Sequence, residues 1–179
     1  MKKNWGILEL LGYSRHDWLN KIQLIKGNVE LGKIDDVKEI INQIVNEAKH
    51  EAELSNLNMP RMAELLLTGN WMNWPFSLEY EVLSVSKGCS NIDEYMYNWT
   101  VEFIQTLSSL IDLYGENALK ITIYCSEQTV RFTFDLQGKI KEEQTMTLFL
   151  QKGPSLAVLH LVSFTEEELV FEIEFNVPV

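Results

Sequence analysis

The segment Ser14-Arg15-His16-Asp17-Trp18-Leu19-Asn20-Lys21 contains residue types that are suited to phosphoryl transfer. An imidazole has an ordinary pKa near 6.5, so at neutral pH much of it is uncharged and offers a nitrogen lone pair. Such a nitrogen on His16 can attack a phosphoryl group and later release it. Arg15 could neutralise charge on the transferring group, Asp17 could accept a hydrogen bond from the other ring nitrogen and so fix the tautomer, and Asn20 could contact the ring one helical turn onward. The alternative is an ordinary solvent-exposed histidine.

The helix face around His16 is rich in small and polar residues. His16 lies one position past an apolar slot, so its side chain is expected to point away from the core. Gly12, Asn20, Gln23 and Gly27 share its side of the helix. A glycine inside a helix costs about 1 kcal/mol relative to alanine. We therefore interpret Gly12 and Gln23 as part of a partner-binding surface. On this surface the small side chains let another protein approach the helix closely.

The remaining histidines and the two cysteines are given structural interpretations. His50 is expected to be a solvated helix residue, with a supporting role near His16 as the alternative, and His160 to be a satisfied core or edge residue. The histidines lack metal-ligand spacing, so no metal site is predicted. Cys89 and Cys125 are expected to be two buried thiols.

Two helices are predicted to position His16, over residues 4–31 and 36–56. In the first helix, apolar residues recur at alternating spacings of three and four, as on one face of a helix. These residues are Leu8, Leu11, Trp18, Ile22, Ile25 and Val29, with Arg15 filling one slot. The second helix repeats the pattern from Ile34 to Ala48. Gly32 is expected to end the first helix, and Asp35 to cap the second. The short loop makes the helices antiparallel neighbours.

Residues 1–58 therefore form a helical hairpin with two apolar stripes. Two helices alone cannot bury both stripes, so the hairpin is predicted to be half of a four-helix bundle. The rest of the chain does not look like a second helical hairpin. The other half is expected to come from a second copy of the chain, in a homodimer.

Residues 59–179 are predicted to form a separate α+β domain. A connector with Pro60, Gly69 and Pro75 is expected to contain one helical turn at 62–67. A helix is predicted at 92–114, and strands at 77–86, 119–125, 130–136 and 169–175, several of which alternate strictly between apolar and polar residues. The segment 156–164 fits either a strand or a helix, and a strand is favoured. Residues 126–129 are expected to form a hairpin turn.

Composition and charge restrict the class of protein further. The 179 residues carry a formal net charge of −11, which disfavours binding to nucleic acid or to an anionic membrane. No window approaches the ~18 apolar residues of a transmembrane helix, and the N-terminus lacks the apolar core of a signal peptide. The sequence thus predicts a cytoplasmic protein with neither nucleic acid nor membrane as a partner.

The run from His16 to Gly27 resembles the phosphoacceptor box of the sporulation-type histidine phosphotransferases of bacilli. The resemblance is close over residues 8–57 and weaker but colinear beyond, for example over residues 77–83. It implies a homodimeric four-helix bundle in which His16 is phosphorylated, followed by a degenerate kinase-like α/β sandwich domain. It also implies transfer from a single-domain response regulator to a DNA-binding response regulator, in the initiation of sporulation. No cofactor is expected on this chain, and Mg²⁺ is expected on the partner regulator.

The main alternative is an ATP-dependent sensor histidine kinase of the same hairpin type. Such kinases hold ATP with an asparagine-bearing helix and two glycine-rich boxes, because phosphate binding requires close backbone approach. Here Asp135-Leu136-Gln137-Gly138 retains one glycine, and Gly153-Pro154-Ser155 is a lone glycine before a proline. Asp135 is interpreted as a turn residue at a strand end. A non-enzymatic dimeric adaptor that docks response regulators is the other alternative.

Overall fold

The computed structural model describes residues 5–86 and 88–176, and the chain divides into two compact units, residues 1–49 and 50–179. The first unit contains helix α1 (Ile7–Glu30) and most of helix α2 (Ile34–Asn56), whose last turns belong to the second unit. The two predicted helices are confirmed. The predicted start of the first helix at residue 4 lies outside the described residues.

Gly32 ends the first helix, as predicted. Its φ of +71° lies in the left-handed region that glycine adopts without a steric cost. The amides of Gly32 and Lys33 donate to carbonyls of the last turn of α1 at 3.0 and 2.9 Å, which satisfies groups that a helix end leaves free. The prediction that Asp35 caps the second helix is wrong. Helix α2 begins at Ile34, and Asp35 lies in the first turn, where a carboxylate favours the positive end of the helix dipole.

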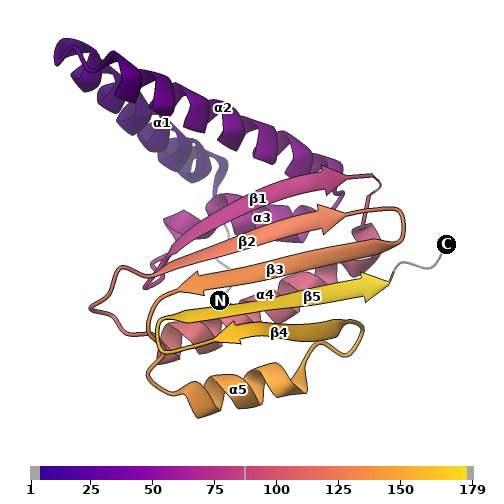
Figure 1. The fold of residues 1–179 in the computed structure, drawn as a ribbon. Coiled ribbons are helices and arrows are strands. Elements are labelled where there is room, and N and C mark those ends of the chain that lie inside the picture. The colour runs from indigo at the N-terminus through magenta and orange to yellow at the C-terminus, as the bar shows by residue number, and fades with distance from the viewer. Residues whose placement is uncertain (1–4, 87, 177–179) are drawn as a thin grey trace. The chain divides into compact units, whose positions relative to one another are not determined.

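The second unit is a five-stranded mixed sheet with helices, which confirms the α+β prediction. The strands are β1 (Ser77–Val85), β2 (Ala118–Cys125), β3 (Thr129–Gln137), β4 (Val158–Phe164) and β5 (Glu168–Asn176), in the order β1-β2-β3-β5-β4. Strands β1 and β2 are parallel, and the other neighbouring pairs are antiparallel. The helices are α3 (Pro60–Thr68), α4 (Asp93–Leu110) and α5 (Glu143–Lys152), with 3-10 turns η1 (Gly69–Trp71) and η2 (Ser90–Ile92). Helices α3 and α4 lie behind the sheet in Figure 1.

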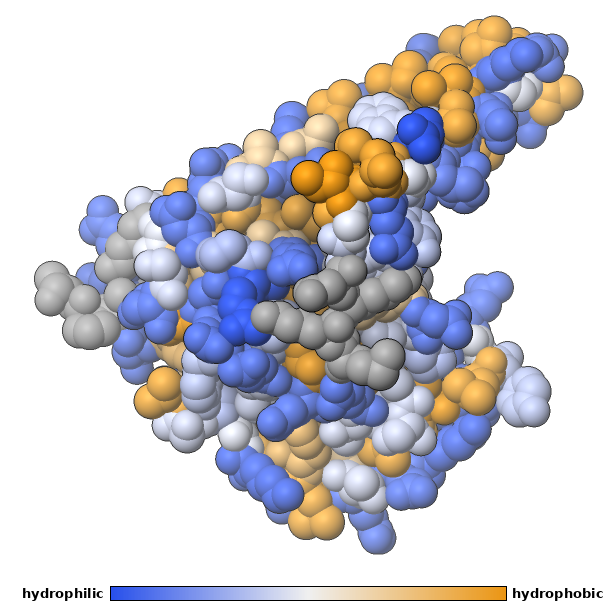
Figure 2. Space-filling view, turned by 180° about the vertical axis from the view of Figure 1, so that it is seen from behind, coloured by the Kyte–Doolittle hydropathy of each residue, from blue (hydrophilic) through white to orange (hydrophobic). Residues whose placement is uncertain are grey.

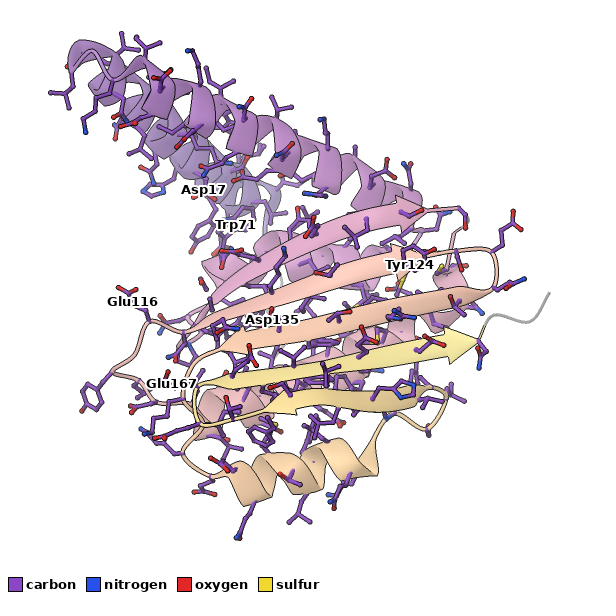
Figure 3. All side chains as sticks on the ribbon, viewed as in Figure 1. Asp17, Trp71, Glu116, Tyr124, Asp135 and Glu167 are labelled. Carbon is purple, nitrogen blue, oxygen red and sulfur yellow. The ribbon has the colours of Figure 1, made fainter. Side chains whose placement is uncertain are left out.

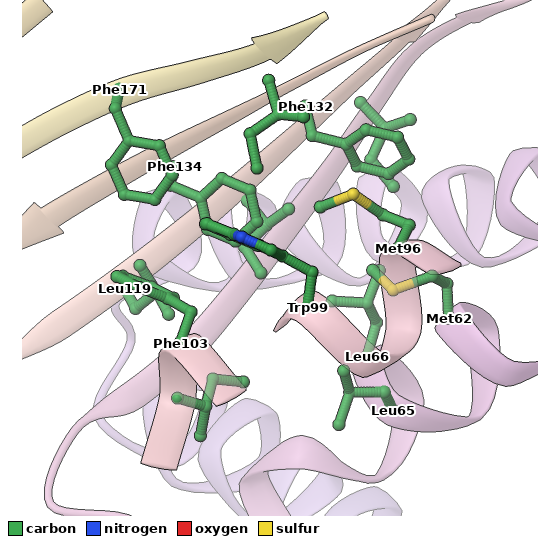
Figure 4. Packing of buried hydrophobic residues seen from close by; sticks show 14 of the residues in the cluster. Met62, Leu65, Leu66, Met96, Trp99, Phe103, Leu119, Phe132, Phe134 and Phe171 are labelled. Carbon is green, nitrogen blue, oxygen red and sulfur yellow. The ribbon is translucent and has the colours of Figure 1, made fainter. Parts of the chain in front are cut away.

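An aromatic cluster holds helix α4 against the sheet (Figure 4). The rings of Phe134 on β3 and Phe171 on β5 stack with centroids 4.8 Å apart, and Phe103 of α4 contacts Phe171 edge-on at 5.1 Å. Trp99 stacks on Phe103 at 5.7 Å. Such pairs contribute about 0.5–1.5 kcal/mol beyond the burial of their surface. The strict alternation of β3 therefore places its apolar face in the core and its polar face outside.

Several predicted boundaries differ from the structure. The helix expected to reach residue 114 ends at Leu110, because Ile111 forms a bridge with Ile140 and the Asp112 amide donates to the Lys139 carbonyl at 2.8 Å. The predicted turn at 62–67 is a longer helix that starts at Pro60, a residue favoured at the first helical position. The favoured strand at 156–164 is confirmed as β4, from Val158. Helix α5 was not predicted.

Strand β1 is an edge strand whose outer side is covered by two side chains. The Asn70 amide donates to the Leu78 carbonyl at 2.7 Å and accepts from the Leu78 amide at 2.8 Å. Nδ1 of His50 lies 3.3 Å from the Val82 amide nitrogen, which donates to it. These contacts occupy backbone groups that an exposed edge would offer to another chain. The interpretation of His50 as a solvated residue is therefore wrong: the side chain is half-buried and bonded to the β1 backbone.

Candidate functional site

His16 lies in the middle of α1, on a rigid regular element of the first unit. Its side chain is 72% exposed, so a second protein can reach the ring. A helix holds a nucleophile in a fixed orientation, and this lowers the entropic cost of a bimolecular transfer. Asp17, the next residue, is labelled on this helix in Figure 3. The structure thus places His16 on an accessible helix surface, away from any core.

Two side chains contact the same ring nitrogen of His16. Nδ2 of Asn20 lies 3.3 Å from Nδ1, and Oδ1 of Asp17 lies 3.6 Å from it. An amide N–H can only donate, so the first contact favours the tautomer with the proton on Nε2. A carboxylate favours a proton on Nδ1 instead. The two neighbours therefore bias the ring toward opposite proton positions, and both of these contacts lie at Nδ1.

Arg15 and His16 point in different directions. Neighbouring helical residues are about 100° apart, and Arg15 occupies a slot on the apolar stripe. Its side chain is exposed. Of the residues predicted to support His16, the structure brings Asn20 and Asp17 to the ring and places Arg15 on the adjacent face.

A shallow depression of about 530 Å³ adjoins His16 along α1. Its lining residues are Asn20, Gln23, Leu24, Gly27, Asn28 and Leu31. Two of the predicted site residues, Asn20 and Gln23, contribute to it, whereas Gly12 lies one turn before His16 and outside it. Apart from the backbone of α1 itself, a Cβ atom added at Gly12 or at Gly27 would meet no atom of the described residues within 4 Å. Packing within the chain therefore does not explain either glycine.

The apolar stripes of the hairpin are exposed in a single chain. No residue of α1 is buried. Stripe residues of α1 and α2 that remain largely exposed are Leu8, Leu11, Trp18, Ile22, Val29, Ile34, Ile41 and Val45. Figure 2 shows apolar side chains gathered along this hairpin. An exposed apolar surface of this extent marks an interaction site.

The residues at the positions of the kinase nucleotide motifs have structural roles in this chain. Asp135 lies inside β3, on the sheet face turned toward the viewer in Figure 3, and its Oδ1 accepts from Nε2 of Gln137 at 2.9 Å. Its interpretation as a turn residue at a strand end is wrong. A Cβ atom at Gly138 would lie 2.4 Å from Oδ1 of Asn117, so a buried side chain fills the space beside this glycine. Gly153, with φ +53°, ends helix α5.

The other predicted candidates lie outside this site. His160 is exposed on the edge strand β4, in register with Glu172 of β5, so it is an edge residue rather than a core residue. The prediction that Cys89 and Cys125 are buried is confirmed. Among residues 5–86 and 88–176, no three His, Cys, Asp or Glu side chains gather so as to hold a metal ion. No helix in the same ranges is long and apolar enough to cross a membrane.

Comparisons with known proteins identify the family. Residues 1–57 match the family model described as "Sensor_kinase_SpoOB-type, alpha-helical domain", and residues 58–176 match "Sporulation initiation phospho-transferase B, C-terminal". The chain is 34% identical over 169 residues to sporulation initiation phosphotransferase B of Bacillus subtilis (strain 168), covering 93% of this chain and 88% of that protein.

Solved structures with a similar chain course share little sequence with this protein. Histidine kinase AdeS of Acinetobacter baumannii is 13% identical, with 90% of this chain and 97% of that chain covered and a TM-score of 0.44. A structure described as a bacterial phosphotransferase is also 13% identical, with 96% and 98% covered and a TM-score of 0.37.

The two family models and the Bacillus subtilis relative define a phosphotransferase of the two-component phosphorelay class. Within this class, the chain belongs to the sporulation initiation phosphotransferase B family.

Proposed function

We propose that this protein carries a phosphoryl group on His16 and passes it between aspartates of two response regulators in the phosphorelay that initiates sporulation. The observation that carries the proposal is the exposed imidazole on α1 with both of its polar contacts at Nδ1. The donor would be a single-domain response regulator, and the acceptor a DNA-binding response regulator. Both act in the cytoplasm, where we place this chain.

Nε2 is the atom that we assign as the nucleophile. Nε2 has a lone pair when the ring proton lies on Nδ1. The Nδ1–H group can then donate a hydrogen bond to the Asp17 carboxylate, whose Oδ1 lies 3.6 Å away, after a small side-chain rotation. Asn20 can assist this tautomer by turning its amide so that the oxygen faces Nδ1. The phosphorus–oxygen bond to the donor aspartate breaks as the Nε2–phosphorus bond forms. The reverse exchange then transfers the group to the acceptor aspartate.

Charge on the transferring group would be neutralised largely by the partner. Mg²⁺ bound by the carboxylates of the regulator fits this role, because divalent cations offset charge on phosphoryl oxygens. Arg15 lies on the adjacent face of α1 and would contribute from the rim of the interface. The chain itself would use neither ATP nor a cofactor.

We propose that a second copy of the chain covers the exposed apolar stripes, giving a homodimeric four-helix bundle. The eight exposed stripe residues of one chain would contribute on the order of 12–24 kcal/mol if fully buried. Association itself costs an estimated 4–15 kcal/mol. The stripes are therefore large enough to drive dimer formation even if only part of their surface is buried.

The surface of α1 around the depression is proposed to receive the regulators. Gly12 and Gly27 keep this surface low, and Gln23 and Asn28 offer polar groups to a partner. Gly12→Ala is expected to raise the free energy of unfolding by about 0.5–1 kcal/mol, because glycine is unfavourable inside a helix and the site is open. Gly12→Leu should be similarly stabilising, yet should weaken regulator binding at least about tenfold, because its side chain stands above the surface.

Thermal melts and titration calorimetry with a regulator measure the two effects. Glu39→Leu, at an exposed position of α2, is the control for an added apolar side chain. Regulator binding by Gly12→Leu that equals binding by the unaltered protein would contradict the docking surface.

A transfer assay tests the proposed function. The protein is mixed with a radiolabelled phosphorylated response regulator in the presence of Mg²⁺ and without ATP. Label that is acid-labile and base-stable should appear on this chain, and should then pass to a second regulator. Transfer should also run in reverse, because both phosphorylated species are reactive. Binding of the regulator without label transfer would establish the adaptor alternative, and label from ATP alone would establish the kinase alternative.

A further inference from the structure

We propose that the groove between helix α5 and strand β4 binds an extended peptide segment of a partner protein, which adds to the edge of the sheet as a further strand. The groove has a volume of about 440 Å³, within the range of ~300–1,000 Å³ that is usual for ligand sites. Helix α5 and strand β4 run alongside each other (Figure 1). They line the groove with Thr147, Leu150, Gln151, Val158, Leu159 and Leu161. The site does not involve His16.

Strand β4 is an edge of the sheet. It is outermost in the strand order, and β5 is its one strand neighbour in the part of the chain that the structure describes. Every second residue of an edge strand directs its N–H and C=O groups away from the sheet, where they can pair with another chain. At the opposite edge, Asn70 and His50 cover the β1 backbone. A register shift between Leu161 and Ser163 ends the regular part of the β4 edge, so the segment available for pairing is Val158 to Leu161, beside the groove.

The residues of this edge select an uncharged, apolar strand. From Pro154 to Thr165 the sequence contains no Asp, Glu, Lys or Arg, the residues with which proteins commonly block the pairing of an exposed edge. Val158 and Leu161 are 50% and 52% exposed, and Leu150 is buried at the α5 side of the groove. A strand in the groove would cover these residues with every second side chain and direct the others to solvent.

The two ends of the groove differ in charge. Lys139, which precedes α5, forms an ion pair with Glu166 in the turn between β4 and β5, so the start of α5 and this turn share one end of the groove. Glu142, Glu143 and Glu167 add three further carboxylates at this end. A basic residue of a peptide is therefore attracted to the end of the groove where α5 begins.

An antiparallel strand with a basic N-terminal flank matches this distribution of charge. Strand β4 runs from Val158, close after the end of α5, to Phe164 at the acidic end. An antiparallel neighbour therefore begins at the carboxylates and ends near Lys152, the last residue of α5. Strand β4 of a second copy is a poorer occupant, because it carries no Lys or Arg and brings its own α5 to the same edge.

Synthetic peptides test the site on the full chain. The probe is a fluorescein-labelled peptide with two N-terminal lysines followed by alternating valine and threonine, and fluorescence anisotropy measures its binding. We expect saturable binding with a dissociation constant on the order of 100 µM. A peptide with both lysines at the C-terminus has the same composition and should bind about threefold more weakly. Backbone N-methylation of the valines alone or of the threonines alone should abolish binding in one case only, because alternate N–H groups face β4.

Hydrogen exchange and a pair of variants locate the site. In the unaltered protein, the peptide should slow amide exchange in the fragment 156–164 and leave the fragment 77–85, at the other edge, unchanged. Leu161→Lys should weaken binding at least about tenfold, because it places a charge in the groove. Val162→Lys is the matched control, because Val162 lies on the same strand, is 62% exposed and is not among the residues that line the groove.

Four results would each overturn the proposal. The first is no binding of the probe at a protein concentration of about 0.5 mM. The second is loss or retention of binding in both N-methylated peptides. The third is equal binding by the Leu161→Lys and Val162→Lys variants. The fourth is protection of the fragment 156–164 that rises with protein concentration in the absence of peptide, because this would show that a second copy occupies the edge.

Discussion

His16→Gln is expected to abolish phosphoryl transfer while leaving the fold intact. Glutamine has a similar length but lacks a nucleophilic nitrogen, so no covalent intermediate can form. Loss of an essential nucleophile should reduce transfer at least about a thousandfold. The His16 side chain is 72% exposed, so the free energy of unfolding should change by less than about 0.5 kcal/mol. The measurements are acid-labile phosphate on the chain, label on the acceptor regulator, and a thermal melt.

His160→Gln is the matched control for this experiment. It is the same chemical change at an exposed histidine on β4, and transfer should remain at the level of the unaltered protein. Asn20→Ala should give an intermediate result, with transfer slowed about tenfold, because one hydrogen bond that orients the ring is lost. Label on the His16→Gln protein, or loss of transfer in His160→Gln, would contradict the assignment of His16.

The regular elements could be predicted from the sequence because their apolar residues repeat with a clear period. The long stripes on α1 and α2 and the alternation from Val130 to Leu136 each extend over several repeats. Gly32 ended its helix for a local reason, its positive φ. The local period of apolar residues is therefore enough to predict a helix or strand that has one buried face and one exposed face.

Tertiary contacts explain the elements that the sequence did not reveal. Helix α5 has ten residues and buries only Met146 and Leu150, which is too few positions to define a period. Helix α4 stops at Leu110 because the pairing of Ile111 with Ile140 replaces the next helical turn. The contact of His50 with Val82 joins residues 32 positions apart, and no local pattern contains that information.

The candidate site was predictable where helix spacing alone fixes the neighbours. Asn20 is four residues after His16, and the structure places its amide at the ring. Asp17 reaches Nδ1 through its own side-chain rotamer, although the backbone points it about 100° away. The depression also includes Leu24, Asn28 and Leu31, which depend on how α1 ends and could not be assigned from residue types alone.

A single carboxylate placed in either apolar stripe is expected to dissociate the proposed dimer. Ile41 of α2 and Ile22 of α1 are 45% and 54% exposed in one chain, so Ile41→Asp or Ile22→Asp should be tolerated by the monomer. In a symmetric dimer the change occurs twice, and each buried unpaired carboxylate is strongly unfavourable. The dissociation constant should rise at least about a thousandfold, which corresponds to about 4 kcal/mol.

Sedimentation velocity at micromolar concentration distinguishes the two states, with Gln43→Asp as the control. Gln43 is two positions from Ile41 and therefore about 200° around the helix, and its side chain is exposed. The Gln43→Asp change adds the same charge to the same helix, outside the apolar stripe. This variant should therefore sediment as a dimer like the unaltered protein. If the unaltered chain sediments as a monomer, or if Ile41→Asp remains dimeric, the apolar stripes are not covered by a second copy and the four-helix bundle is wrong.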